Sequence, residues 1–409
     1  MWASTLLAAS LSFAAQPAPP AKGSQAAVTP APDIEQTRTE IAAIEALLPR
    51  IADRGAGLFL LAREYAHAGE AAQALRVLRE CMALEAGFDP SDSPALRPLR
   101  GEPGFGELSR RAQAQYPPVH RARLVFDVPT ADLFPEGLAV DTGNGTFYMG
   151  SMHHKKIVSF RLGGLVREFV REGVYDLMPV GGVHVEPTDH SVWASTDAGK
   201  KYRPELLHFD SAGRLLERYA SPGRMPYDLN DLVLHGDSEI FATDTEGNHV
   251  YRFSRRARTF SELQLFRPVL DPNGITISAD GRLLFVADIL GVIRVDLQKN
   301  ESEDVAPDAH DSLSGIDGLY WYKGDLVGVQ YGTGKFRVAR WHLSPDGRRV
   351  LGHELLEYRT ALVDDPTTGA IYRDSFYFMA NTGIVNLDND EIVDHTKLAP
   401  VHIATVSLR

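Results

Sequence analysis

Two patterns of hydrophobic and polar positions divide the chain at the Pro117–Pro118 pair. Before this pair, apolar residues such as Ile41, Ile44 and Leu47 recur at steps of three or four, the spacing of one face of an amphipathic helix. After it, short apolar runs alternate with tight polar turns, which is typical of antiparallel strands joined by hairpins. The chain is therefore expected to have a small α-helical part followed by a larger all-β part.

The helical part is predicted over residues 33–116, with a hairpin of helices over 58–68 and 70–85 that turns at Gly69. It resembles a tetratricopeptide repeat through Leu61, Tyr65, Gly69, Ala74, Leu78 and Cys81. A solenoid needs about three such repeats, and only one is visible. The segment is therefore expected either to dock on the β part or to bind a protein partner. Cys81, the single cysteine, is expected to be an inert core thiol.

The β part, residues 119–409, repeats a strand-and-turn unit about every 45 residues, as propeller blades do. Six units of this length predict an all-β six-bladed propeller with four strands in each blade. Segments 121–128 and 401–408 are both strand-like and lie at the two ends of this region. We expect them to pair in the last blade, which closes the ring and removes its exposed edges.

Polar residues recur at one phase of this repeat, each just before or within an apolar run. Asn230 lies 43 residues before Asn273, Asp317 lies 44 residues after Asn273, and Glu136 lies 94 residues before Asn230. Any one of them alone is more typical of a turn. Their shared phase instead predicts that four side-chain oxygens converge on the axis of the ring. Carboxylate and amide oxygens are the ligands of hard cations, so the set predicts a site for Ca²⁺ or another divalent cation.

Residues 120–409 resemble the senescence-marker-protein and gluconolactonase family of six-bladed propellers, which is related to paraoxonases and diisopropyl-fluorophosphatases. The resemblance is carried by Pro135-Glu136-Gly137, Asn230-Asp231, the stretch 272–288 and Asp317-Gly318. It implies a divalent cation, commonly calcium, held near the central tunnel by Glu136, Asn230, Asn273 and Asp317. Asp231, next to Asn230, is expected to orient that ligand.

The chain departs from these relatives at two positions. Gly181 stands at the second-blade position where paraoxonases carry a histidine, so a histidine proton shuttle is not expected there. Two residues before Asn230, where the sugar-lactone enzymes of the family place an arginine, the chain has Asp228. This departure argues against recognition of an aldonolactone in the way those enzymes recognise it. Tyr227, Arg224 and Thr368 are the predicted substrate contacts at the rim of the site.

Other kinds of site have less support. The chain has no Gly-x-Ser-x-Gly motif to anchor a serine-hydrolase triad. The His153-His154 pair and the single residues His184, His310, His353 and His402 show no metal-ligand spacing among themselves, and surface or core roles are expected for them. A net charge of −12 argues against nucleic acid or an anionic membrane as a partner. A small-molecule substrate is the expected partner.

The N-terminus differs from the rest of the chain. Residues 1–22 carry no charge before Lys22 and have an apolar stretch that is typical of a cleavable signal peptide, too short to span a membrane. Residues 23–32, rich in Pro and Ala, are expected to be a linker. A signal peptide implies a periplasmic or secreted protein; if the segment is not an export signal, the protein would be cytoplasmic.

These observations together predict a calcium-dependent hydrolase of a lactone or related ester. Asp317 is the expected catalytic residue, because a metal-bound carboxylate can also accept a proton from attacking water. Two alternatives stay open. The first is a non-catalytic propeller whose metal is structural and which binds a ligand or a protein. The second is a lyase of the kind found in the strictosidine-synthase relatives.

Overall fold

The computed structural model of the 409-residue chain describes residues 34–91, 93–197, 202–222, 228–388 and 390–409. The predicted signal peptide and linker, and the predicted rim residues Arg224 and Tyr227, lie outside these residues. Within them, no helix has the length and apolar character needed to cross a bilayer.

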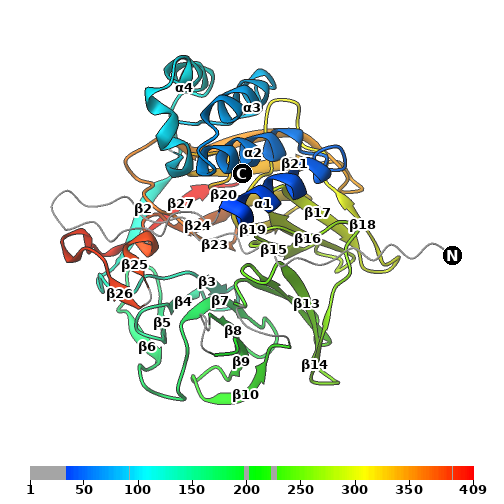
Figure 1. The fold of residues 1–409 in the computed structure, drawn as a ribbon. Coiled ribbons are helices and arrows are strands. Elements are labelled where there is room, and N and C mark those ends of the chain that lie inside the picture. Colours follow the sequence, from blue (N-terminus) through cyan, green and yellow to red (C-terminus); the bar gives the residue numbers. More distant parts are fainter. Residues whose placement is uncertain (1–33, 92, 198–201, 223–227, 389) are drawn as a thin grey trace.

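Helices occupy the N-terminal part of the described chain (Figure 1). They are α1 (Ile34–Leu47), α2 (Arg54–His67), α3 (Ala71–Ala83), the 3-10 helix η1 (Pro94–Gly101) and α4 (Phe105–Gln115). As the apolar periodicity predicts, α2 and α3 form a hairpin, and Gly69 turns it with a φ of +74°, a conformation that favours glycine. Cys81 is fully buried between these helices, and burial raises the pKa of its thiol well above its usual range.

Six β-sheets follow, arranged as blades around a centre (Figure 1). Blade 1 contains β3 (Leu138–Asp141), β4 (Thr146–Ser151), β5 (Lys156–Phe160) and β6 (Arg167–Val170). Blade 2 contains β7 (Val180–Val185), β8 (Val192–Thr196), β9 (Glu205–Phe209) and β10 (Leu215–Ala220). Blade 3 contains β11 (Leu232–His235), β12 (Glu239–Asp244), β13 (His249–Ser254) and β14 (Thr259–Glu262). Blade 4 contains β15 (Ile275–Ile277), β16 (Leu283–Asp288), β17 (Gly291–Asp296) and β18 (Glu301–Asp304).

The last two blades join the two ends of the propeller. Blade 5 contains β19 (Ile316–Tyr322), β20 (Asp325–Gln330), β21 (Arg337–Leu343) and β22 (Val350–Tyr358), with β1 (Val119–His120) added at its edge. Blade 6 contains β23 (Gly369–Tyr372), β24 (Ser375–Met379), β27 (Val401–Ser407) and β2 (Arg123–Val128). The pairing of β2 with β27, with Val128 opposite Val401, confirms the predicted closure of the ring. Short elements between β24 and β27 are η2 (Ile384–Asn386), β25 (Leu387–Asp388), β26 (Glu391–Ile392) and η3 (His395–Lys397).

The hydrophobic core lies between neighbouring blades. Every residue of β16 is buried, because both faces of this strand are covered by adjacent sheets. Phe285 of β16 and Trp341 of β21, both fully buried, belong to the cluster between blades 4 and 5. The outer strand β10 instead alternates between half-buried and exposed positions. This gradient from inner to outer strands is why apolar runs near the start of each unit were easy to recognise in the sequence.

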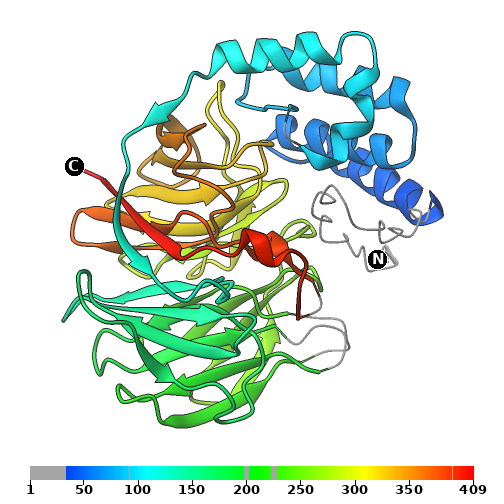
Figure 2. The same ribbon diagram turned by 90° about the vertical axis from the view of Figure 1, so that its left-hand side faces the viewer.

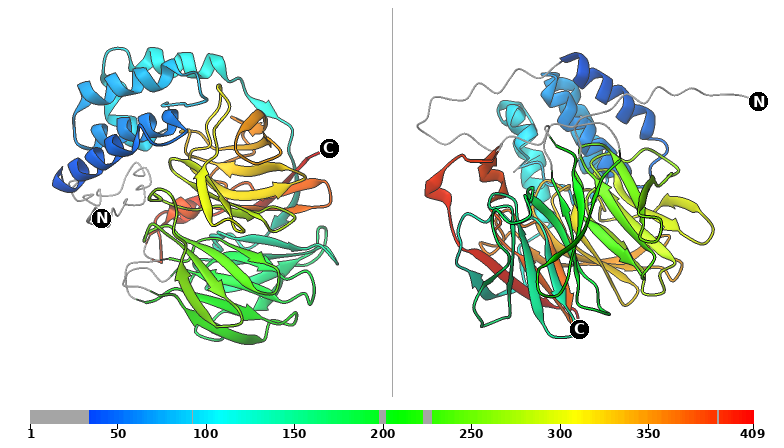
Figure 3. Two further views of the ribbon diagram at one scale, coloured as in Figure 1. Left: turned by 90° about the vertical axis from the view of Figure 1, so that its right-hand side faces the viewer. Right: turned by 90° about the horizontal axis from the view of Figure 1, so that it is seen from below.

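The helical segment docks on one side of the propeller, over blades 4 and 5 (Figures 1, 2 and 3). Leu270, Ile289 and Leu290, which lie in loops of blade 4, belong to the same apolar cluster as the helices. Asp53, the N-cap of α2, accepts hydrogen bonds from Ser312 Oγ at 2.7 Å and from Leu313 N at 2.8 Å. The loops that contact the helices lie on the face of the propeller where the inner strands begin. The predicted metal ligands lie on the same face.

Candidate metal centre

The four predicted ligands lie at corresponding places in four blades. Glu136, Asn230 and Asn273 each lie two residues before an inner strand, and Asp317 is the second residue of β19. Inner strands run side by side around the axis of a propeller. The shared phase in the sequence is therefore also a shared position in the fold.

Direct contacts link these positions around the ring. Gly182 N donates to Asn230 O at 2.7 Å, Thr243 Oγ1 donates to Asn273 O at 2.8 Å, and Thr368 Oγ1 donates to Glu136 O at 2.6 Å. The backbones also approach closely: a Cβ on Gly137 would lie 2.3 Å from Gly181 O. Glycine is required there because any side chain would push adjacent blades apart.

Three of the four predicted ligands carry buried oxygens that remain unsatisfied. Glu136 Oε2, Asn273 Oδ1 and Asp317 Oδ1 are inaccessible to solvent and have no hydrogen-bond partner among the described residues. Asn273 and Asp317 are each 7% exposed. A buried oxygen without a donor costs about 1–3 kcal/mol, so three of them at equivalent positions of three blades are the feature expected where a protein binds a ligand. These oxygens fit a calcium or other hard divalent ion.

The acids at this centre repel one another. Burial, and then the nearby charge of Glu136, raise the pKa of Asp317 well above its usual range. Burial, followed by the charges of Asp365, Asp197 and Asp231, raises the pKa of Glu136 to about 8. Each shift has the sign expected when carboxylates gather in a low dielectric without a compensating cation. Both shifts favour the protonated acids in the metal-free protein, whereas a bound cation would favour their ionised forms.

Further buried acids accompany the predicted ligands. Burial raises the pKa of Asp365 to about 6, although Val385 N donates to its carboxylate at 3.1 Å. Asp228 and Asp244 form a buried pair, in which burial and then the charge of Asp244 raise the pKa of Asp228 well above its usual range. Asp228 is thus an additional acid at the position where the sugar-lactone enzymes of the family carry an arginine.

Two of the other predicted residues make hydrogen bonds with the backbone. Asp231 Oδ1 accepts a hydrogen bond from Leu232 N at 2.8 Å, so this carboxylate is fixed by the strand backbone. Thr368, predicted at the rim, is buried and closes the ring through its bond to Glu136 O.

A cavity of about 370 Å³ follows the axis and is lined by the inner strands of all six blades. Gly137, Asp231 and Thr368 mark its end nearest to the predicted ligands. Most of its wall is apolar, with residues such as Ile275 and Trp321. A largely apolar cavity of this size with a few polar groups at one end is typical of a small-molecule site.

The helical segment places a positively charged arginine side chain in the same region. Arg63 of α2 has a buried Nε without a hydrogen-bond partner among the residues described. Burial raises the pKa of Asp271, and this rise is opposed by a hydrogen bond from Tyr331 Oη at 3.1 Å and then by the charge of Arg63. Asp271 lies two residues before Asn273. The helical periodicity of α2 gave no indication that Arg63 would lie near the propeller axis, because that placement depends on docking.

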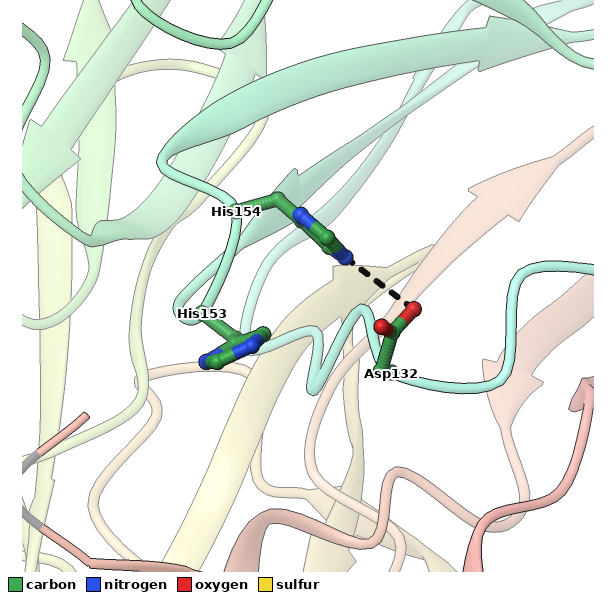
Figure 4. A group of neighbouring side chains, drawn as sticks. All are labelled: Asp132, His153 and His154. Atoms are coloured by element: carbon green, nitrogen blue, oxygen red, sulfur yellow. Dashed lines mark ion pairs between the residues drawn. The ribbon is translucent and has the colours of Figure 1, made fainter. Parts of the chain in front are cut away.

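A second group of possible ligands lies in blade 1. Asp132, His153 and His154 offer ligand atoms that all lie within 4.8 Å of one another (Figure 4). Surface or core roles were predicted for these histidines, because their spacing in the sequence matches no metal-binding motif. Asp132 lies before β3 and was not part of that prediction. The loop before β3 and the turn after β4 lie next to each other in the folded blade, and this brings Asp132 close to the two histidines.

The fold is similar to that of several solved propellers. One is a gluconolactonase from Xanthomonas campestris, with 16% identity over 71% of this chain and 90% of that one, at a TM-score of 0.50. Another is a calcium-binding protein, regucalcin, from Agrobacterium tumefaciens, with 18% identity over 72% and 96% and a TM-score of 0.50. A luciferin-regenerating enzyme has 14% identity over 71% and 95% and a TM-score of 0.51.

These similarities confirm the predicted six-bladed propeller of the gluconolactonase type as a fold. Identities of this size establish the architecture and leave the chemistry to the residues of the site. No protein-family model and no curated protein matches the chain.

Proposed function

We propose that the protein is a calcium-dependent hydrolase of a lactone or related ester. The observation that carries this proposal is the set of three unsatisfied buried oxygens on Glu136, Asn273 and Asp317 at equivalent places in three blades. Asn230, half-buried at the same place in blade 3, would supply the fourth oxygen. Two carboxylates and two amides leave coordination positions for water and substrate.

The chemistry follows from what these residues can do. Bound calcium would polarise the carbonyl of the ester and stabilise the negative charge that develops on its oxygen. Glu136, Asn230 and Asn273 would hold and orient the ion. Asp317 would contribute to the same ligand set, and its carboxylate would accept a proton from the attacking water. The apolar wall of the axial cavity would exclude bulk water from the neighbourhood of the reacting groups.

A non-catalytic binding propeller is the second candidate. It is favoured by the docked helical segment, which packs on the face that carries the predicted ligands and brings Arg63 near Asp271. In that case the ion would serve stability and the cavity would hold a ligand without turnover. The strictosidine-synthase-like lyase has no such supporting observation in the described residues.

Turnover of a substrate panel separates these candidates. The full chain would be freed of metal and assayed on five- and six-membered lactones and on aryl esters, with calcium and with a chelator. We expect calcium-dependent hydrolysis that falls about 10²-fold or more in Asp317→Asn, because this variant keeps an oxygen for the ion but loses the base. Asp237→Asn, the same change in an exposed turn, is the matched control and should keep full activity.

Two results would count against the hydrolase. Calcium binding by the wild type without turnover on any member of the panel would favour the binding propeller. Full activity of a calcium-bound Asp317→Asn variant would exclude Asp317 as the base.

A further inference from the structure

The residues Asp132, His153 and His154 form a cluster that the central site does not use. Asp132 belongs to the loop between β2 and β3, and the two histidines belong to the turn between β4 and β5. Figure 4 shows the three side chains converging from these two segments. Their ligand atoms lie within 4.8 Å of one another, and His154 Nε2 lies 3.0 Å from Asp132 Oδ1.

The backbone around the cluster is fixed before any ligand binds. Ser151 Oγ accepts a hydrogen bond from His154 N at 3.0 Å and donates one to Leu133 O at 2.6 Å. One hydroxyl thus ties the histidine turn to the loop that carries Asp132. Phe134 packs edge-on against the His153 ring, with 5.9 Å between the ring centres. Such preorganisation is what a metal site requires of its ligands.

His154 lies between two carboxylates. Glu172 Oε2 lies 2.9 Å from His154 Nδ1, and Asp132 lies at Nε2. In the tautomer with its proton on Nδ1, the ring donates to Glu172 and the lone pair of Nε2 faces Asp132. This carboxylate–imidazole arrangement recurs behind the histidine ligands of metal sites, where it orients the ring and raises its basicity.

The simplest alternative is a protonated His154 bridging two carboxylates. This alternative accounts for Asp132, Glu172 and His154, but it gives no role to His153. His153 Nδ1 is buried and has no hydrogen-bond partner in the part of the chain that the structure describes. A buried imidazole nitrogen without a partner, beside a second imidazole and a carboxylate, is accounted for if the ring binds an ion through the cluster.

We propose that Asp132, His153 and His154 form a binding site for a divalent transition-metal ion of the zinc class, separate from the central calcium site. Two imidazole nitrogens and one carboxylate match the preference of zinc, whereas calcium takes oxygen ligands. In tetrahedral zinc coordination two neighbouring ligand atoms lie about 3.3 Å apart, close to the present separation of Nε2 and Oδ1. Water would complete the coordination, since the cluster is only partly buried.

Zinc titration of the full chain tests this proposal. Chelator-treated protein would be saturated with calcium to fill the central site and then titrated with Zn²⁺ by calorimetry at pH 7.5. We expect one zinc per chain in the wild type. Asp132→Asn and His153→Gln should each weaken binding at least tenfold, and Glu172→Gln by about tenfold, as for a residue that only positions a ligand.

Two controls make the result specific. His190→Gln is matched to the cluster variants, because His190 Nδ1 pairs with Asp141 Oδ2 at 2.9 Å but belongs to no group of three ligands in the described chain. It should bind zinc as the wild type does. Glu136→Gln removes a predicted calcium ligand and should also keep the zinc site. Binding of Co²⁺ provides an independent readout, because a tetrahedral site gives a visible absorption band that His153→Gln should abolish.

The proposal fails if the calcium-saturated wild type binds no zinc. It also fails if His153→Gln binds zinc as tightly as the wild type, since His154 would then be only an ion-pair partner of Asp132 and Glu172. Loss of zinc in Glu136→Gln, with retention in His153→Gln, would assign the ion to the central ring.

Discussion

Two groups of buried acids in this propeller differ in what surrounds their oxygens. In blade 5, Asp311 Oδ1 accepts from Arg337 at 2.6 Å and Oδ2 accepts from Trp341 Nε1 at 2.7 Å, so both oxygens are satisfied. At the centre, Glu136 and Asp317 each keep an oxygen without a partner among the residues described, and each carboxyl has a raised pKa. The first group is complete as a structural network. The second becomes complete only when a cation binds.

This difference gives a physical criterion that distinguishes structural buried acids from ligand-binding ones in this fold. A carboxylate with a cationic partner and full hydrogen bonding stabilises the blade that carries it. Carboxylates and amides that face one another without donors lower stability, and proteins keep such groups where they bind something. The criterion separates the centre from blade 5 although both places are similarly buried and acidic.

The largest expected effect on stability comes from neutralising Asp311, the acid that is paired with Arg337. Asp311→Asn leaves the guanidinium of Arg337, a fully buried side chain, without its compensating charge. We expect the free energy of unfolding to fall by about 3–5 kcal/mol, with and without calcium. Urea denaturation measures it, and the exposed variant Asp237→Asn should stay within about 0.5 kcal/mol of wild type. A loss below about 1 kcal/mol would show that the blade 5 network is not structural.

The pH dependence of calcium binding comes next. Burial, helped by neighbouring acids, raises the pKa of Glu136 to about 8, so below that pH calcium must displace a proton. We expect calcium affinity to fall at least tenfold for each pH unit from 8 down to 6, because Glu136 releases one proton and the raised pKa of Asp317 adds to the effect. Calorimetry in buffers of different ionisation heat would also report the released proton. Affinity that is independent of pH in this range would contradict the assignment of Glu136.

The metal-free protein should show the opposite trend. Its folded state holds the Glu136 proton up to a higher pH than the unfolded chain does, so its stability falls as pH rises from about 4.5 to about 8. Calcium should remove most of this decline.

The smallest effect sharpens the contrast with Asp311. Asp317→Asn removes a carboxyl group whose ionised form is disfavoured at the centre, so in chelator we expect the free energy of unfolding to rise by about 1 kcal/mol or more. In saturating calcium the gain should disappear, because the amide of the variant binds the ion more weakly than the carboxylate does. A variant that is less stable than wild type in chelator would mean that Asp317 is structurally paired in the metal-free protein.

Much of the fold was predictable because a propeller repeats. The inner strands are buried on both faces, so their apolar runs are visible, as in the residues around Ile275 and Leu284. The same repetition made it possible to predict Glu136, Asn230, Asn273 and Asp317 as one set, since a shared phase in the sequence becomes a shared position at the axis. The closure of the ring by β2 and β27 followed from the need to cover two edges.

Other features were not predictable, because they depend on contacts between segments that share no period. Docking of α2 places Arg63 near Asp271, and nothing in the helical pattern identifies which charged residue faces the propeller. Asp132 meets His153 and His154 only because the loop before β3 and the turn after β4 are adjacent in the blade. Asp231 and Thr368 were recognised by position, but their hydrogen bonds depend on backbone geometry.

Calcium binding by the wild type and by Glu136→Gln, measured by calorimetry on metal-free full-length protein at pH 8, tests the central claim most directly. The account predicts one tightly bound calcium in the wild type and at least a hundredfold weaker binding in the variant, because a carboxylate ligand is replaced by a neutral amide. Asp237→Asn should bind as the wild type does. Equal affinity of Glu136→Gln and wild type, or no calcium binding by the wild type, would contradict the assignment of the unsatisfied oxygens to a cation.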